Sequence, residues 1–163
     1  MFEKFGEMNL EELNQAAAGL KKEGDETSLF ALAQENGLDK EDVEDYLDDL
    51  VPELATVSSA AYGRIKLWKE QPLGDWNVSA AVSVIISMTE IMIAGDSKLA
   101  AALLRKGKRP EQIYQAMKSE AEKHKTGGMA VSCGTDKQLQ DIIRAYFLDE
   151  ANLSKVVQEV GRC

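Results

Sequence analysis

The chain has 163 residues and a net charge of −9 at pH 7, a length typical of one domain, or of a small domain with an appendage. Its two cysteines, Cys133 and Cys163, form no Cys-x-x-Cys pair, which argues against a disulfide framework or a metal site of that kind. Residues 1–13 lack the apolar core of a signal peptide, and the longest apolar stretch, Val78 to Met88, is too short to span a bilayer. We therefore expect a reduced, cytoplasmic protein that does not enter a membrane.

The charge is divided unevenly along the chain. Residues 1–56 hold 16 acidic and 4 basic residues, a net charge of −12, whereas residues 57–163 hold 12 acidic and 15 basic residues, a net charge of +3. Such a division favours an electrostatic partner for each half. The alternative is an acidic appendage that only keeps the protein in solution.

Three helices are predicted before residue 51, because each has a start signal. Asn9 with Glu12 forms a capping-box pattern, Asp25 begins a run of capping residues, and Asp39 caps a third helix. The first helix should end at Gly24 and the second at the pair Asn36–Gly37. The apolar positions expected to form their buried faces are Leu10, Leu13, Ala17, Leu20, Leu29, Phe30, Leu32, Ala33, Val43, Tyr46, Leu47 and Leu50.

A longer fourth helix is predicted from Glu53 to about Gln71, with Pro52 tolerated in its first turn and a weak point at Gly63. Residues 71–77 contain a proline and a glycine and predict a break. We place a domain boundary there, with an acidic helical module at residues 1–71 and a second helical domain at residues 72–163.

The second half also predicts helices. Val78 to Ala94 is nearly all apolar and is expected to be a buried central helix, although a strand over Val82 to Ile86 is the rival assignment. A helix restarts at Gly95–Asp96 and ends at Gly107, and another opens at Pro110. Residues 125–134 predict a loop, with or without a brief strand. The last two helices should be capped by Thr135, with Gln138, and by Asn152. The prediction is an all-α helical bundle of about eight helices.

Residues 32–49 have the spacing of a helix-turn-helix, with Ala33 and Val43 as packing residues and Gly37 as the turn glycine. A DNA-reading helix would carry cations or amides, but here carboxylates would face phosphate, which disfavours binding. Two interpretations remain: a solvated acidic face, or an acidic surface that docks on a basic groove of a nucleic-acid-binding protein. The carboxylates in question are Asp39, Glu41, Asp42, Glu44, Asp45, Asp48 and Asp49.

The largest basic cluster lies between two predicted helices and consists of Arg105, Lys106, Lys108 and Arg109. Cations at a helix C-terminus complement the helix dipole, which is the simpler interpretation. Contact with phosphate or with an acidic protein, including a second copy of this chain, is the alternative. Trp68 and Trp76 flank the predicted break, and we expect them to pack there rather than to stack on bases.

Residues suited to catalysis are few. His124 is the single histidine and is expected to cap a helix end, and Cys133 lies in a glycine-bounded loop, nine residues after it. A Cys-His dyad is the less favoured alternative. Lys125 to Gly128 lacks the spacing of a P-loop, and the carboxylates after Asp39 do not follow a calcium loop. We predict no enzyme, no metal site and no cofactor.

Two stretches carry a family resemblance. IISMTEIMIAGDSKLAAALLRKGKRPEQIYQAMKSEAEKH, together with CGTDKQLQDIIRAYF, resembles the PcfK-like proteins of conjugative elements and phages. Residues 1–49 are similar to N-terminal regions of mobile-element proteins. The resemblance implies an accessory protein of a mobile element, and because some PcfK-like proteins are anti-CRISPR inhibitors of type II effector nucleases, it implies that activity here.

We therefore expect a non-enzymatic protein that inhibits an RNA-guided nuclease by placing its acidic helices in the positively charged nucleic-acid channel. Residues 78–160 would serve as a scaffold, with self-association as a further option. The alternatives are a conjugation accessory protein that docks on the transfer machinery, and a nucleic-acid-binding module that uses the basic cluster.

Overall fold

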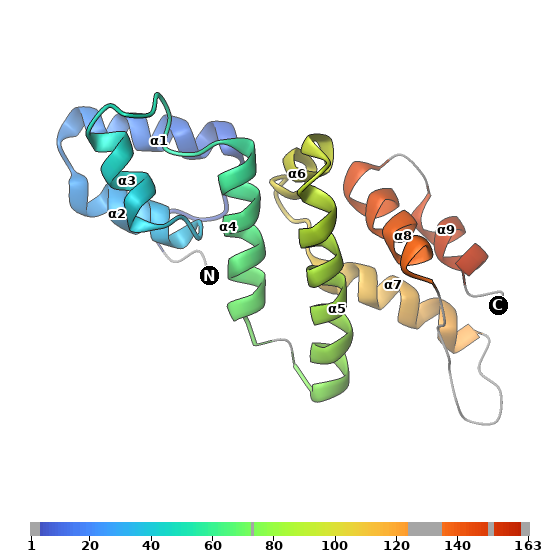
Figure 1. Ribbon diagram of the computed structural model, residues 1–163. Helices are drawn as coiled ribbons and strands as arrows, with labels where there is room; N and C mark the ends of the chain where they lie inside the picture. The colour runs from blue at the N-terminus through green and yellow to red at the C-terminus, as the bar shows by residue number, and fades with distance from the viewer. Residues whose placement is uncertain (1–3, 73, 124–134, 150–151, 161–163) are drawn as a thin grey trace. The chain divides into compact units, whose positions relative to one another are not determined.

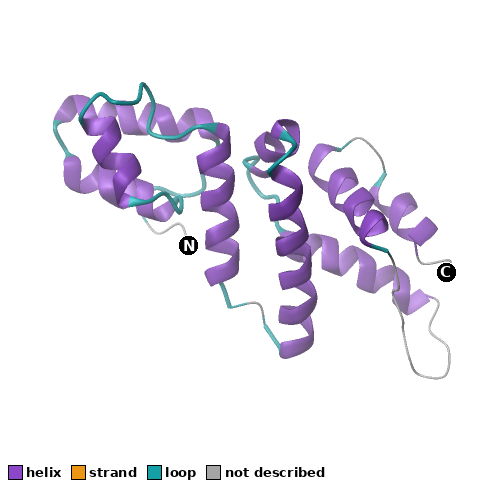
Figure 2. Ribbon diagram, in the orientation of Figure 1, coloured by secondary structure: helices purple, strands orange, loops and turns teal. Residues whose placement is uncertain are grey.

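The computed structural model describes residues 4–72, 74–123, 135–149 and 152–160, and in this part of the chain it is all α (Figure 2). The all-α part of the prediction is confirmed. The described residues form nine helices rather than about eight, and Val82–Ile86, where a strand was the rival assignment, are helical. The predictions for His124, Cys133, Cys163 and the loop at residues 125–134 lie outside the described residues. The helices are α1 (Leu10–Glu23), α2 (Glu26–Glu35), α3 (Lys40–Leu47), α4 (Val57–Glu70), α5 (Trp76–Ile93), α6 (Ser97–Leu103), α7 (Pro110–Lys123), α8 (Asp136–Leu148) and α9 (Leu153–Val160) (Figure 1).

The chain divides into two compact units. The first comprises Met1–Gln71 with Leu103–Gly107, and the second comprises Pro72–Ala102 with Lys108–Cys163. The short segment 103–107 thus groups with residues far from it in sequence. The predicted domain division at residue 71 remains a prediction.

Local capping explains where most helices begin. The Asn9 side chain accepts a hydrogen bond from the Glu12 N–H at 2.9 Å, and the Glu12 carboxylate accepts one from the Asn9 N–H at 3.0 Å. This capping box satisfies donors that a helix start otherwise leaves without partners. Thr135 and Gln138 form the same arrangement at α8, while α1 ends at Gly24, whose φ is +73°. These predicted boundaries are confirmed.

Helix α4 begins at Val57, so the predicted start at Glu53 is wrong. The side chain of Asn14 on α1 donates to the Ala55 carbonyl at 2.8 Å and accepts from the Ala55 N–H at 3.0 Å. These two bonds engage both backbone groups of Ala55 and are incompatible with a helix through that residue. Thr56 then caps the helix through Ser59. A residue 41 positions away in the sequence therefore decides where α4 starts.

The core of the first unit lies among α1, α2, α3 and α4. Ala33 and Val43, which were predicted to pack, are both buried, and Gly37 has a φ of +74°. Gly37 and Gly63 bring the backbone of the α2–α3 turn directly against α4: a Cβ built on Gly63 would lie 2.4 Å from the Asn36 carbonyl oxygen. Gly63 was predicted as a weak point of its helix, and in the structure it permits this close approach.

A buried ion pair also holds the first unit together. Arg64 on α4 is 2 % exposed, and its guanidinium contacts the Glu7 carboxylate at 2.6 Å and the Met8 carbonyl at 3.0 Å. The second oxygen of Glu7 accepts from the Gly107 N–H at 3.2 Å. Glu7 thereby links the N-terminal segment to α4 and to residues 103–107. A charge pair with further hydrogen bonds is the form in which buried charges are tolerated.

In the second unit, α5 packs on α7 and α8, and α9 packs on α7 and α8. Asp96, at the start of α6, accepts hydrogen bonds from the Leu99 N–H at 3.0 Å and from Arg144 on α8 at 2.6 Å. These contacts, the Leu99 N–H first, lower the pKa of the Asp96 carboxyl. The large side chains buried in this unit are Ile86, Leu99, Ile113, Ile142, Ile143 and Phe147.

Helix α5 is only partly buried, which corrects the prediction of a buried central helix. Val84 is 57 % exposed and Ile91 is 69 % exposed. Trp76, the first residue of the helix, is 81 % exposed, so the expectation that it packs beside the break is wrong. Trp68, on the other side of the break, is buried. The helix is 18 residues long with a mean hydropathy of 1.5. By length and composition alone this one helix of the described chain could cross a membrane, a test that core helices of soluble proteins also pass. The apolar stretch Val78–Met88 identified in the sequence is therefore shorter than the helix that contains it.

Candidate functional site

Helix α3 presents the predicted acidic residues to different surroundings. Its buried face is formed by Val43 and Tyr46, which are 0 % and 6 % exposed. Since a helix repeats every 3.6 residues, the carboxylates cannot all lie opposite this face. The structure separates them into two groups by their contacts.

Four of the seven carboxylates are engaged within the first unit. Asp39 pairs with Lys66 of α4 at 2.8 Å, Glu44 pairs with Lys40, and Asp49 pairs with Lys21 of α1 at 2.7 Å. The hydrogen bonds to Asp39 and Glu44 raise the pKa of Lys66 and of Lys40, respectively. The carboxylate of the fourth, Asp42, accepts from the Asp39 N–H at 2.9 Å, so it contributes to the helix start.

The other three form what we call the acidic row: Glu41, Asp45 and Asp48. All three are exposed, and none of them has a side-chain hydrogen bond or ion pair with another described residue. Their spacing of four and then three residues places them on one face of α3, opposite Val43. The row is therefore the part of the predicted surface whose carboxylates form no hydrogen bond or ion pair with another described residue.

The chain turns sharply after the acidic row. Asp48 is the C-cap of α3, and Asp49 adopts a left-handed conformation with φ of +57°. Lys21 donates to the Tyr46 carbonyl as well as to Asp49, which places a cation at the negative end of the helix. Because this turn breaks the helical periodicity, Leu50 is 71 % exposed, and its predicted place on the buried face is wrong.

The predicted basic cluster is divided between the two units. In the first unit, Lys106 pairs with Glu12 at 2.7 Å, which is the main cause of the lowered pKa of Glu12. In the second unit, Lys108 contacts Asp149 at 2.8 Å and the Tyr146 carbonyl at 2.7 Å. Arg109 donates to the Lys108 carbonyl. Arg105 is exposed and belongs to the first unit. Arg105 also takes part in an interaction, so none of the four cations is free.

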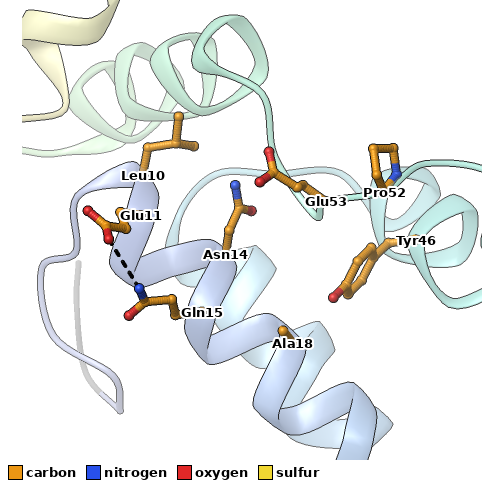
Figure 3. Close-up of a pocket in the computed structure, with 8 residues that line it drawn as sticks. All are labelled: Leu10, Glu11, Asn14, Gln15, Ala18, Tyr46, Pro52 and Glu53. Atoms are coloured by element: carbon orange, nitrogen blue, oxygen red, sulfur yellow. Dashed lines mark hydrogen bonds between the residues drawn. The ribbon is translucent and has the colours of Figure 1, made fainter.

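A groove of about 600 Å³ lies beside α3, between α1 and the segment that follows α3 (Figure 3). Leu10, Ala18 and Pro52 supply apolar surface, and the charged lining residues, Glu11 and Glu53, are both acidic. Figure 3 shows Tyr46 directed across the groove toward α1. A second hollow of about 310 Å³ shares Pro52 and Glu53 and is also lined by Asp42 and Asp45.

Two features of this region were not predicted from the sequence: the groove, and the carboxylate of Glu53, which has no ion pair with a described residue. The signal available was the pair Pro52–Glu53, which lies within an irregular segment rather than opening a helix. Among the described residues, no three His, Cys, Asp or Glu side chains are arranged to hold a metal ion. Comparison with family models, with curated proteins and with solved structures found no match for this chain.

Proposed function

We propose that this is a non-enzymatic protein of a mobile genetic element that inhibits a type II RNA-guided DNA nuclease. It acts as an anti-CRISPR-type inhibitor by docking its acidic surface on a basic nucleic-acid-binding surface of the enzyme. The helix-turn-helix-like arrangement of α2 and α3 serves as the module that presents this surface. The observation that carries the proposal is the acidic row, whose three carboxylates have no ion pair in the described chain.

The dimensions of the row support this interpretation. A rise of 1.5 Å per residue separates positions i and i+7 by about 10 Å along the helix, and one DNA strand advances about 3.4 Å per nucleotide. The row therefore extends over about three phosphates. Because Glu41, Asp45 and Asp48 are exposed and form no ion pair with a described residue, no internal salt bridge has to break when a basic channel binds them. Opposite charge also speeds association.

The alternative function, nucleic-acid binding through residues 105–109, is less favoured because Lys106 and Lys108 are already paired with Glu12 and Asp149. Binding of phosphate would compete with these contacts. Docking on conjugation machinery uses the same acidic row and differs only in the partner. A cleavage assay separates these functions.

The test compares two triple variants of equal charge. The row variant carries Glu41→Gln, Asp45→Asn and Asp48→Asn. The paired variant carries Asp39→Asn, Glu44→Gln and Asp49→Asn, and it removes three carboxylates that have internal partners. Asparagine is accepted both at an N-cap and in a left-handed conformation, so the paired variant should keep its fold.

Each protein is added in excess to a guide-loaded type II nuclease, and cleavage of a target duplex is measured. We expect the unmodified protein to block cleavage, the row variant to lose about tenfold or more in potency, and the paired variant to stay within about twofold. Unimpaired cleavage with the unmodified protein would reject inhibition of that nuclease. An equal loss in both variants would show that net charge matters and the row does not.

A further inference from the structure

The groove between α1 and the segment after α3 has the composition of a peptide-binding site. Its lining is apolar at Leu10, Ala18 and Pro52, and its charged residues, Glu11 and Glu53, are acidic. An apolar surface with charge of one sign at its border suits a ligand that combines apolar side chains with the opposite charge. The ligand chemistry that matches this lining is a basic, amphipathic peptide.

Tyr46 adds an independent observation. The residue is 6 % exposed, so its ring is held in the core, and Lys21 lies 4.4 Å from the ring centroid. Its hydroxyl forms no hydrogen bond with a described residue, yet it lines the groove and points toward α1 (Figure 3). The hydroxyl oxygen is not among the buried polar atoms that lack a partner, so it is open to the groove. A ligand in the groove can therefore form a hydrogen bond with it while the ring stays packed.

We infer that this groove binds a basic, amphipathic segment of the protein partner. This inference rests on the proposed function and deepens it, since it names the part of the partner that is recognised. A lysine or arginine of the segment pairs with Glu53, an apolar side chain packs on Leu10 and Pro52, and a polar group bonds the Tyr46 hydroxyl. The second hollow shares Pro52 and Glu53 with the groove and is also lined by Asp45 of the acidic row.

The test uses synthetic peptides and isothermal titration calorimetry. One short peptide alternates lysine with leucine, a second replaces each leucine with serine, and a third replaces each lysine with glutamate. We expect only the lysine–leucine peptide to bind measurably. If the lysine–serine peptide bound equally well, the attraction would be electrostatic alone and the groove would not be a peptide site; binding by the glutamate–leucine peptide would also contradict the proposal.

Three variants locate the binding. Tyr46→Phe keeps the ring and removes the hydroxyl. It should lower the affinity for the lysine–leucine peptide about fivefold, which corresponds to the loss of one hydrogen bond. Glu53→Gln should lower the same affinity about two- to fivefold. Ala18→Trp fills the groove and should abolish binding. The matched controls are Tyr62→Phe, on the exposed part of α4, and Ala101→Trp, at an exposed position of α6.

Circular dichroism shows whether each variant is folded, and folded variants that bind like the unmodified protein would overturn the inference. The result is separable from the proposed function. If Ala18→Trp inhibits the nuclease fully while the row variant does not, the groove is not used and the acidic row stands. If no nuclease is inhibited but the peptide binds and responds to Tyr46→Phe, the groove stands and the proposed target is wrong.

Discussion

Replacing Gly63 with alanine should destabilise the first unit, although alanine is the better helix former. The residue lies inside α4 and faces the turn that leads into α3. An alanine Cβ would lie 2.4 Å from the Asn36 carbonyl oxygen, about 1 Å closer than an ordinary van der Waals contact of 3.4 Å. The atoms that it meets belong to the backbone of Asn36 and Gly37. No side-chain rotation can relieve the overlap, so the turn must move.

The net effect follows from two opposing terms. Alanine in place of glycine stabilises a helix by about 1 kcal/mol. Forcing an extra methyl group into a packed site costs about 3 kcal/mol when only backbone movement can accommodate it. The free energy of unfolding should therefore fall by about 2 kcal/mol. The displacement would also reach Asp39 and the start of α3, which carries the acidic row.

The assay is urea unfolding followed by circular dichroism, with Gly19→Ala as the control. Gly19 lies inside α1, and a Cβ built on it meets no atom within 4 Å. The same substitution should there raise the free energy of unfolding by about 1 kcal/mol. A stabilisation by Gly63→Ala equal to that of Gly19→Ala would refute the close approach of the turn to α4.

Three further predictions concern stability. Arg64→Met should lower the free energy of unfolding by about 3 kcal/mol, because it leaves the charge of Glu7 without its guanidinium partner. Asn14→Ala should lower it by about 2 kcal/mol, because both hydrogen bonds to Ala55 are lost. Asp96 has a lowered pKa, so its contribution to stability is present above the pKa of an unfolded aspartate, about 3.9, and is lost as the pH falls through its folded value. Asp96→Asn should therefore reduce the loss of stability measured on acidification.

Each of these has its own check in the same unfolding assay. Adding Glu7→Gln to Arg64→Met should recover part of the loss, and a double variant no better than the single one would contradict the buried-charge explanation. The control for Asn14→Ala is Gln15→Ala, which removes one exposed hydrogen bond to Glu11. It should lower the free energy of unfolding by less than about 0.5 kcal/mol. An acid-unfolding profile that is the same with Asp96 and with asparagine would argue against the assigned pKa direction.

Local sequence determined most of the helix boundaries. The capping boxes at Asn9 and Thr135 join residues three positions apart, and the left-handed glycine at residue 24 needs only its own conformational freedom. Such signals act within one turn of helix, so they can be identified without knowing the fold. The burial of Ala33 and Val43 followed in the same way from helical periodicity.

Only the tertiary structure decided which carboxylates are available. Asp39 and Asp49 look equivalent to Asp45 in the sequence, but cations 27 and 28 residues away neutralise them. Asn14 likewise sets the start of α4 from 41 residues away. The reason is physical: a charge or a backbone group can be paired by any residue that the fold brings within about 3 Å, and sequence separation does not report that distance. The acidic character of α3 was therefore predictable, whereas the row formed by Glu41, Asp45 and Asp48 was not.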